Sequence, residues 1–496
     1  MTRIAHRQAA AGAGRVSGRR QPASKIIAGC SAAMLALALG AVLPAQAPSS
    51  SPPSAAPAPA PVSAGDLLGG VPRGRASGQV LRLSLAQAVS RGLQANLAAL
   101  LASSQTASAR AGRLAALSGL LPHVQAQAYD LRQKVSLAAF GINFPGVPPI
   151  IGPFNVADAR LYLHENLLSL SNFQQWRAAR AGAQAAASSY RQIRNLVVEA
   201  VSDQYQLTLA DAASLAAAQA QLATATQAWR QARDKEKSGL VNALDVVRAQ
   251  VQRAAERQRV IAARYALAGQ RLRFARMIGL PEGQRYILTD RLQALPPAPP
   301  LNPRAAVAEA WRRRPDLLAA AQAVRAAQLS AAAARDRRVP QFSLDANYGT
   351  IGHTFTADHP TFVVEGSLSM PLFAGGQIRA ATAAARQRLR RARERLADLR
   401  AAVAEQVRLA LLNLQSSYHQ ARVAAQARAY ATQELQLARD RFHAGVADNL
   451  DEVRAEQALA QANQGYIASL YQYNAARAAL ATALGRLPLA AMPGAH

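Results

Sequence analysis

The alternation of apolar and polar residues predicts four β-strands in two pairs. At 342–349, Phe, Leu, Ala and Tyr alternate with Ser, Asp, Asn and Gly. In the next segment, 362–372, the apolar residues share one face: Phe362, Val364, Leu368, Met370 and Leu372. An earlier and less regular pair lies at roughly 125–135 and 158–168, with a Gly- and Pro-rich loop at 136–155. A two-residue period is typical of strands with one apolar and one polar face.

Long helices are predicted on both sides of these strands. The proline-free stretches 172–236 and 377–443 contain 65 and 67 residues, about 100 Å each at 1.5 Å per residue. Helical spacing gives each an apolar stripe: Ile193, Leu196, Val197, Ala200 and Val201 in one, and Leu396, Leu399, Val403, Val407, Leu411 and Leu414 in the other. Shorter helices are predicted at 84–120 and 243–278. Together the two shorter helices match one long helix, and Ala-rich faces allow close coiled-coil packing.

The chain contains two copies of one unit, which we assign to residues 80–295 and 296–487. Leu83-Ser-Leu-Ala-Gln-Ala-Val matches Leu301-Asn-Pro-Arg-Ala-Ala-Val at an offset of 218. Further on, Gly239-Leu-Val-Asn-Ala-Leu-Asp matches Gly445-Val-Ala-Asp-Asn-Leu-Asp at an offset of 206. The first copy therefore carries about 12 additional residues between Pro122 and Gly239. A repeated supersecondary unit that stacks on its neighbour is the simplest architecture for such a pattern.

Composition favours helices and excludes several classes of protein. Of 496 residues, half are hydrophobic but only 5% are aromatic, which suits closely packed Ala-rich helices. The net charge is +29, yet the basic residues are spread along the helices without an aromatic stacking motif, so we expect no nucleic-acid partner. No Lys follows a Gly, which excludes a Walker-type phosphate loop. The single Cys, Cys30, excludes a disulfide framework and a CxxC site.

The first 47 residues are predicted to be a secretory signal peptide. Basic residues precede an apolar run at 26–43, and Ala45-Gln-Ala47 gives a small-x-small cleavage site. A retained membrane anchor is the competing interpretation of this run. Ile27-Ala-Gly-Cys30 also resembles a lipobox, which makes Cys30 an alternative lipidation site. Residues 48–79 are expected to form a Pro/Ala/Ser-rich N-terminal arm, and 488–496 a C-terminal tail.

Strands of this length and alternation can cross a bilayer at a tilt. Four strands cannot close a barrel, and an open sheet edge is not tolerated in lipid. Transmembrane strands would therefore require oligomerisation, and three copies would give twelve strands around an aqueous lumen. The alternative is a small soluble β-layer that caps a helical bundle.

The sequence resembles the TolC family of bacterial outer-membrane efflux proteins. The resemblance covers about residues 80–487 and rests on the order and duplication of short motifs: Leu83-Ser-Leu-Ala-Gln-Ala-Val, Leu-Leu-Pro at 120–122, Met370-Pro-Leu-Phe-Ala-Gly-Gly-Gln, and the two Gly-x-x-x-x-Leu-Asp turns. It implies a mainly α fold with a small β part, in which a homotrimer forms a 12-stranded outer-membrane β-barrel continued by a periplasmic α-helical barrel. It also implies a passive duct that receives substrate from an inner-membrane transporter through a periplasmic adaptor protein.

The resemblance assigns functional residues to the two turns. Gly239, Leu240 and Val241, with Gly445 and Val446, match the family's adaptor-docking tips, although glycine at a helix end is also plain capping. Asp451 matches an acidic position at the family's closed aperture, where Asp448 and Glu452 add negative charge. Arg454 departs from the acidic residue that some members have there, and Asp245 and Arg248 are the counterparts in the first copy. Arg454 and Arg248 are expected to pair with the acids, or all of these residues are i,i+3 surface pairs of small energy.

No residue constellation indicates an enzyme. We find no Ser/His/Asp arrangement, no paired carboxylates at catalytic spacing and no cofactor motif, and His353 and His359 lie in a loop with poor metal-ligand geometry. The expected cofactors and metals are therefore none. The alternative function is a soluble periplasmic coiled-coil scaffold or adaptor without a pore.

Overall fold

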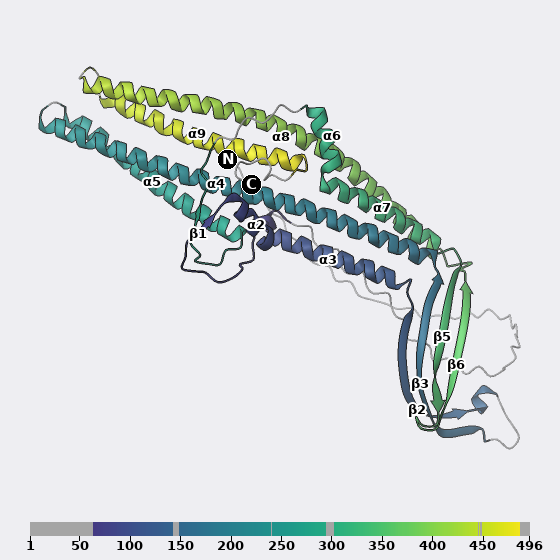
Figure 1. The fold of residues 1–496 in the computed structure, drawn as a ribbon. Helices are drawn as coiled ribbons and strands as arrows, with labels where there is room; N and C mark the ends of the chain where they lie inside the picture. Colours follow the sequence, from purple (N-terminus) through teal and green to yellow (C-terminus); the bar gives the residue numbers. More distant parts are fainter. Residues whose placement is uncertain are drawn as a thin grey trace, which may run out of the picture. The chain divides into compact units, whose positions relative to one another are not determined.

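The computed structural model describes residues 63–141, 148–239, 241–293, 302–444, 446 and 449–486, all within the unit formed by residues 59–496. The predicted signal peptide, including Cys30, lies outside the described residues, as does the C-terminal tail. Within the described part the chain is built of long helices and one four-stranded sheet (Figure 1). The predicted fold class, mainly α with a small β part and a duplicated unit of long helices, is confirmed.

The first repeat follows the predicted order of elements. Its helices and strands are α1 (Ala64–Leu67), β1 (Leu81–Leu83), α2 (Leu85–Ala95), α3 (Leu97–Ser118), β2 (His123–Ser136), the 3-10 turn η1 (Ala138–Phe140), β3 (Ile150–Leu168), α4 (Leu170–Lys237), α5 (Ala243–Met277) and β4 (Tyr286–Leu288). The described part of the expected N-terminal arm packs on this repeat, since the Val71 amide donates to the Ala95 carbonyl.

The described part of the second repeat has the same plan, and the positions that correspond to β1 and β4 lie outside the described residues. It consists of α6 (Pro303–Arg313), α7 (Pro315–Asp336), β5 (Gln341–Gly352), β6 (Asp358–Ser369), α8 (Gln377–His443) and α9 (Asn449–Ala483). The two longest helices, α4 and α8, have 68 and 67 residues, which confirms the two very long helices expected from the sequence.

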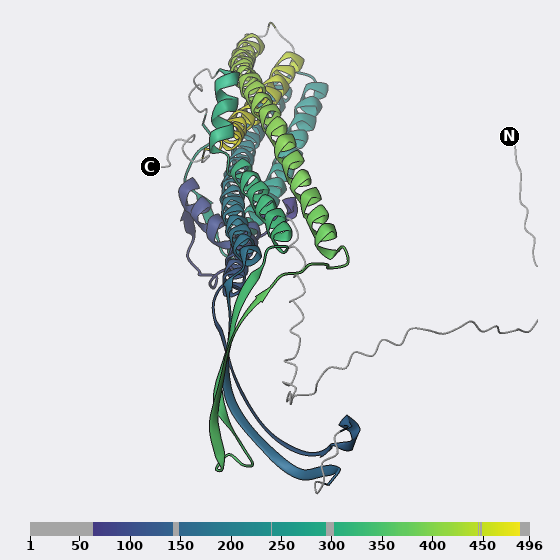
Figure 2. The same ribbon diagram turned by 90° about the vertical axis from the view of Figure 1, so that its right-hand side faces the viewer.

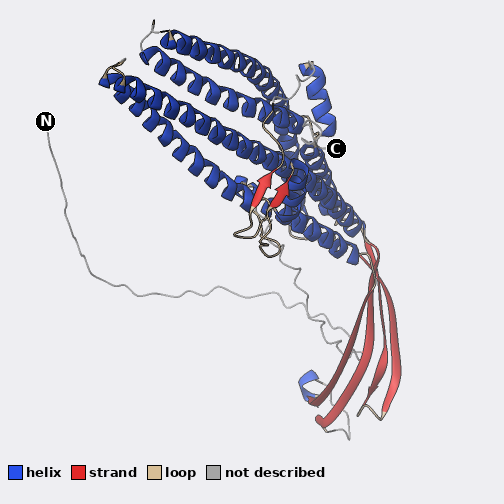
Figure 3. Cartoon of the chain, turned by 60° about the vertical axis from the view of Figure 1, so that its left-hand side comes forward, coloured by secondary structure: helices blue, strands red, loops and turns tan. Residues whose placement is uncertain are grey.

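The long helices form one layer, four helices wide (Figures 1 and 3). Near the strands the order of contacts is α3, α4, α7, α8; near the helix tips it is α5, α4, α9, α8. Each continuous helix therefore lies beside an interrupted one, as the helix lengths predicted. The layer ends in two free edges within the described chain, one formed by α3 and α5 and the other by α8.

The sequence did not predict that the first helix of each repeat is broken in two. The break falls at Asn96 and at Arg314, both in extended backbone, and these positions are related by the offset of 218. Asn96 caps α3 by accepting from the Ala98 amide, while Pro315 starts α7 without needing a backbone donor. The single helix expected at 84–120 is thus wrong, because an N-cap residue restarts the helix at a new angle.

Two glycines of the repeats allow close packing at these breaks. Gly279 and Gly485, separated by 206, both have left-handed backbone and end the last turn of α5 and α9. A Cβ on Gly279 would lie 2.3 Å from the Ala95 Cβ, and one on Gly485 would lie 3.0 Å from the Arg314 backbone nitrogen. Only glycine fits both the backbone conformation and the space.

The hydrophobic cores of the repeats are copies of each other. The first contains Val89, Val197, Val201, Phe274 and Ile278, and the second contains Val307, Val403, Val407, Leu480 and Leu484. Val89 and Val307 are separated by 218 residues, and the other four pairs, taken in order, by 206. Corresponding positions of the two repeats therefore supply both cores. The stripes that the sequence predicted on α4 and α8 supply four of these residues, Val197, Val201, Val403 and Val407. Tyr205 adds a buried hydroxyl that donates to Asp290 Oδ2 at 2.7 Å.

The four-stranded sheet is antiparallel in the order β2-β3-β5-β6, and Figure 2 shows its curvature. The predicted loop at 136–155 is too long, because β3 begins at Ile150 and pairs with Ser136. The predicted fourth strand is also too long: β6 ends at Ser369, before Pro371, which has no amide to donate. Outside this sheet, β1 and β4 form a short parallel pair. In the described part of the chain, no helix has the length and apolar character needed to cross a membrane.

Candidate functional site

The first helix tip joins α4 to α5. Gly239 has a φ of 71°, the left-handed conformation that ends a helix, and Asn242 caps α5 by accepting from the Asp245 amide. No heavy atom lies within 4 Å of a Cβ built on Gly239, and Val241 is half-buried. Leu240 lies outside the described residues. The turn is therefore open on the side of its glycine.

The second tip joins α8 to α9, and of its predicted docking residues Val446 is described and exposed. Gly445 and Asp448 lie outside the described residues. The two tips are tied together by Lys235 of α4, whose Nζ lies 3.8 Å from the centre of the Phe442 ring of α8. This cation–π contact between the repeats was not predicted from the sequence.

The predicted aperture residues fall into different environments. Asp245 is buried and lies 3.5 Å from Arg248, as an i,i+3 pair. Asp451 is half-buried, and Glu452 is buried. Among the described residues Arg454 is exposed and forms no ion pair. Within one chain the structure thus brings Arg248 to Asp245, but it does not bring Arg454 to Glu452.

Arg439 of α8 takes the place that the sequence analysis gave to Arg454. Its Nε donates to Glu452 Oε1 at 3.2 Å and its Nη2 to Glu456 Oε1 at 3.3 Å. One guanidinium thus holds two glutamates one turn apart on α9. The sequence carries a signal for this pair, since Glu452 and Glu456 are spaced i,i+4 near an arginine-bearing helix end.

A third buried glutamate faces this pair from α5. Glu256 is 2% exposed, and its Oε1 accepts from Arg259 at 2.6 Å and from Gln252 at 2.9 Å. Gln252 in turn accepts from Gln457 of α9 at 3.0 Å. We call Glu256, Glu452, Glu456, Arg259 and Arg439 the clamp cluster. It joins α5 of the first repeat to α8 and α9 of the second.

Burial changes the protonation of the clamp cluster. Burial raises the pKa of Glu456 to about 7, with repulsion from Glu452 acting in the same direction and Arg439 opposing it. Burial also raises the pKa of Glu256, and Arg259 lowers it. A carboxyl that titrates near neutral pH is well suited to respond to ordinary changes of acidity.

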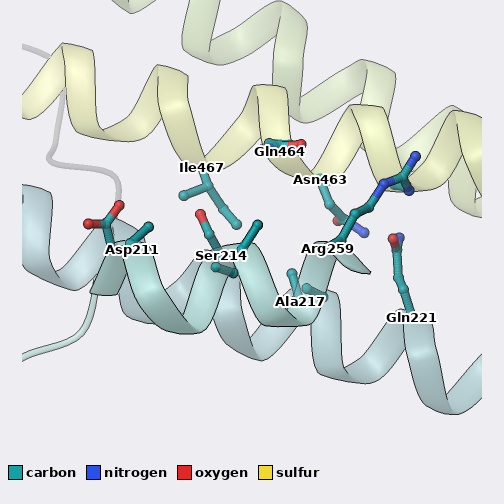
Figure 4. Close-up of a pocket in the computed structure, with 13 residues that line it drawn as sticks. Asp211, Ser214, Ala217, Gln221, Arg259, Asn463, Gln464 and Ile467 are labelled. Atoms are coloured by element: carbon teal, nitrogen blue, oxygen red, sulfur yellow. The ribbon is translucent and has the colours of Figure 1, made fainter. Parts of the chain in front are cut away.

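A small cavity lies inside the clamp cluster and a larger one next to it. The small cavity, about 30 Å³, is lined by Gln221, Thr224, Gln252, Glu256, Leu435, Glu456 and Leu459. The larger, about 340 Å³, lies between α4, α5 and α9. Figure 4 shows Ile467 and Asn463 pointing from α9 toward the α4 and α5 side of this cavity, with Asp211, Gln221 and Arg259 around it.

The chemistry of these tips is that of charge and hydrogen bonding. Within the described ranges, no group of three or more His, Cys, Asp or Glu residues is arranged to hold a metal ion. The acids of the clamp cluster accept hydrogen bonds from arginines and from the Gln252 side-chain amide.

The sheet has one polar and one apolar face. Register places His164, Asp345 and Glu365 in one row and Arg160 in another row of the same polar face. His164 Nδ1 lies 2.7 Å from Asp345 Oδ1, while Arg160 pairs with Asp158 at 2.7 Å and donates to Asn347 at 3.0 Å. The other face is largely apolar, although Glu165 lies on it beside Leu344. Its exposed large hydrophobic residues include Val124, Leu161, Leu168, Tyr348, Phe362, Val364 and Leu368.

Known proteins share this architecture. Residues 306–486 match the family model of the outer membrane efflux protein. A search of curated protein sequences gave no match. Among solved structures, the Campylobacter jejuni CmeC outer membrane channel aligns with a TM-score of 0.70 and 18% identity, over 81% of this chain and 85% of that one.

Two further outer-membrane structures give the same result. The outer membrane protein VceC from Vibrio cholerae aligns with a TM-score of 0.68 and 18% identity, over 81% of this chain and 96% of that one. The open state of the Neisseria gonorrhoeae MtrE outer membrane channel aligns with a TM-score of 0.68 and 18% identity, over 81% and 89%. The resemblance to the TolC family of outer-membrane efflux proteins is therefore confirmed, by the family model in the second repeat and by the shared fold across both.

Proposed function

We propose that three copies of this chain form a passive duct through the outer membrane, as the channel component of a tripartite efflux or secretion system. The observation that carries this proposal is that the helix layer and the sheet both have free edges, and that these edges lie on the same sides of the chain: β2 continues from α3, and β6 leads into α8. The fold of outer-membrane channels and the match to an efflux family support it.

The helix layer presents an unpartnered apolar stripe on each of its edges. On α8 the exposed stripe consists of Leu409, Leu412, Val423, Tyr430 and Leu437. On α5 it consists of Leu244, Val247, Val251, Ile261, Tyr265 and Leu272. Both sets follow spacings of three, four and seven residues or their sums, which keep side chains on one face of a helix. Such stripes are typical of a coiled-coil seam whose partner is a second chain.

The sheet is open at matching places. Its outer strands are β2, which continues from α3, and β6, which leads into α8. A rotation that docks the α8 edge of one copy on the α3 and α5 edge of the next therefore also brings β6 beside β2. This contact is head-to-tail, and such contacts close into rings. With four strands and a four-helix layer from each chain, three copies would give twelve of each.

The faces of the sheet fit a barrel in lipid. The apolar face would meet hydrocarbon, and the polar face with His164, Asp345 and Arg160 would line the aqueous lumen. The helix layer would extend into the periplasm, and the tips at Gly239 and Val446 would meet a periplasmic adaptor protein and, through it, an inner-membrane transporter. An enzyme is not part of this proposal, since the matching family is one of efflux proteins.

Charging the α8 stripe tests the assembly. Val423→Asp should abolish the oligomer because three aspartates would be buried in the seams without partners, while the fold of each chain remains. Ala425→Asp, on an exposed position of the same helix away from the stripe, should leave the oligomer intact. The mass of the detergent-solubilised particle is the measurement. Monomers of the parent chain that remain soluble without detergent would instead favour the alternative, a soluble coiled-coil scaffold.

Asp451 is proposed to lie at the periplasmic aperture. Three copies near the symmetry axis would attract cations and repel anions, whatever the total charge of the protein. Asp451→Ala should therefore lower the cation preference in planar-bilayer recordings, measured as the reversal potential in a salt gradient. Asp398→Ala, on the strand-side half of α8, is the matched control and should keep the parent value. An unchanged reversal potential in Asp451→Ala would remove this residue from the aperture.

A further inference from the structure

The clamp cluster lies where the two helix hairpins meet. Within each hairpin the packing is extensive, α4 on α5 and α8 on α9, whereas α5 touches α9 over a short stretch only. Polar side chains take part in this stretch: Gln457 of α9 donates to Gln252 of α5, and Glu256 and Glu456 line one cavity from the two helices. Part of the contact between α5 and α9 is therefore polar.

The charges of the clamp cluster do not balance. It contains three carboxyl groups, which are almost completely buried, and two guanidinium groups, of Arg259 and Arg439, which reach solvent. With all acids ionised the cluster carries one excess negative charge, close to Glu456. The other helix that packs on this site, α4, contributes Gln221 and Thr224, neither of which is charged. One added proton would make the cluster neutral.

Two residues that line the cavity of about 30 Å³ each have a buried polar atom without a hydrogen-bond partner in the described chain. These atoms are Glu256 Oε2 and Gln221 Nε2, an acceptor and a donor. Glu456 lines the same cavity from the opposite helix. A cavity of this volume has room for a water molecule, which can accept from the amide and donate to both carboxyl groups. Unpaired buried carboxylate oxygen is costly, and protonation removes that cost.

We propose that this cavity is a buried proton-binding site that holds the two hairpins together. A proton from bulk water binds one carboxylate of the Glu256–Glu456 pair, converts it into a carboxylic acid and removes the repulsion across the α5–α9 contact. When the proton leaves, two like charges face each other in a poorly solvated space, and the hairpins separate. The separation would widen the tips and so change the conductance. This effect on conductance rests on the proposed channel function, whereas the contact between the hairpins does not.

The raised pKa of Glu456, about 7, places this change between mildly acidic and mildly alkaline conditions. Burial is its largest cause and Glu452 the second, so the shift follows from the same geometry. The contact should be tight near pH 5.5 and loosened near pH 8.5.

An intrachain distance tests the proposal. Cysteines replacing the exposed Gln258 on α5 and Gln461 on α9, in a Cys30→Ser background, accept spin labels for pulsed electron–electron resonance. Dilution with unlabelled chain leaves one labelled copy in each particle. The parent should show a longer or broader distance distribution at pH 8.5 than at pH 5.5. Glu456→Gln and Glu256→Gln should each keep the short distance at both values, and the exposed Glu434→Gln should follow the parent.

Each result either supports or contradicts the proposed proton site. Loss of the pH effect in either cavity variant, with the effect retained in Glu434→Gln, supports the proton site. A parent without a pH effect, or an effect that persists in both cavity variants, overturns it. The distance is measurable in one chain, so the absence of any pore conductance would count against the proposed channel and leave this result unaffected.

Discussion

Arg439→Ala should lower the free energy of unfolding by about 3 kcal/mol at pH 8, because it removes the cation shared by two buried glutamates. The loss should shrink at pH 5.5. Burial raises the folded-state pKa of Glu456 to about 7 from an ordinary value of 4.5. Below that ordinary value the carboxyl is protonated in both states and costs nothing. Between 4.5 and about 7 the unfolded chain releases the proton while the folded state keeps it, so stability falls over this range and levels off above it, where the folded state buries the charge.

Chemical unfolding of the detergent-solubilised protein at both pH values is the measurement. Arg390→Ala is the matched control, since Arg390 forms an exposed i,i+4 pair with Glu394 on the same helix at 2.8 Å. It should cost only about 0.5 kcal/mol at either pH, as exposed pairs do. Equal losses for the two variants would show that the clamp cluster contributes no more than a surface pair.

Val364→Arg should destabilise the membrane-inserted protein by about 2–4 kcal/mol if this residue lies near the bilayer midplane. Val364 is 65% exposed in the single chain and shares the apolar face with Tyr348 and Leu368. Its neighbour Val363 lies on the opposite face of the sheet, directly across from Asn347. Val363→Arg would place the same charge in the aqueous lumen and should cost little. Unfolding from lipid vesicles compares the two, and equal effects would contradict the assignment of the faces.

Much of the fold could be predicted from the sequence because its signals are local or repeated. Period-two alternation identified all four strands of the sheet, and proline-free apolar stripes identified α4 and α8 almost to the residue. The breaks at Asn96 and Arg314 were missed, since each keeps a helical apolar pattern on both sides and changes only the direction of the chain. The extra length of β3 was missed because Gly152 and Pro153 are unusual in strands.

The candidate site was less predictable for a different reason. The turns at Gly239 and Gly445 stand out in the sequence, but the clamp cluster joins Glu256, Arg439 and Glu456 across three helices. Which faces of α5 and α9 meet is decided by packing over the whole helix layer, and no local pattern gives it. The sequence predicted Arg454 as a partner of the acids, whereas the contact between α8 and α9 brings Arg439 to Glu452 and Glu456.

Electron cryo-microscopy of the purified protein in lipid nanodiscs tests the central claim most directly, that three copies close one duct. We expect particles with three-fold symmetry in which β6 of each copy lies beside β2 of the next, twelve strands cross the lipid, and the α8 stripe packs on α5 of a neighbour. Single chains or dimers with the edges of β2 and β6 unpaired, or a sheet that lies outside the lipid, would contradict it.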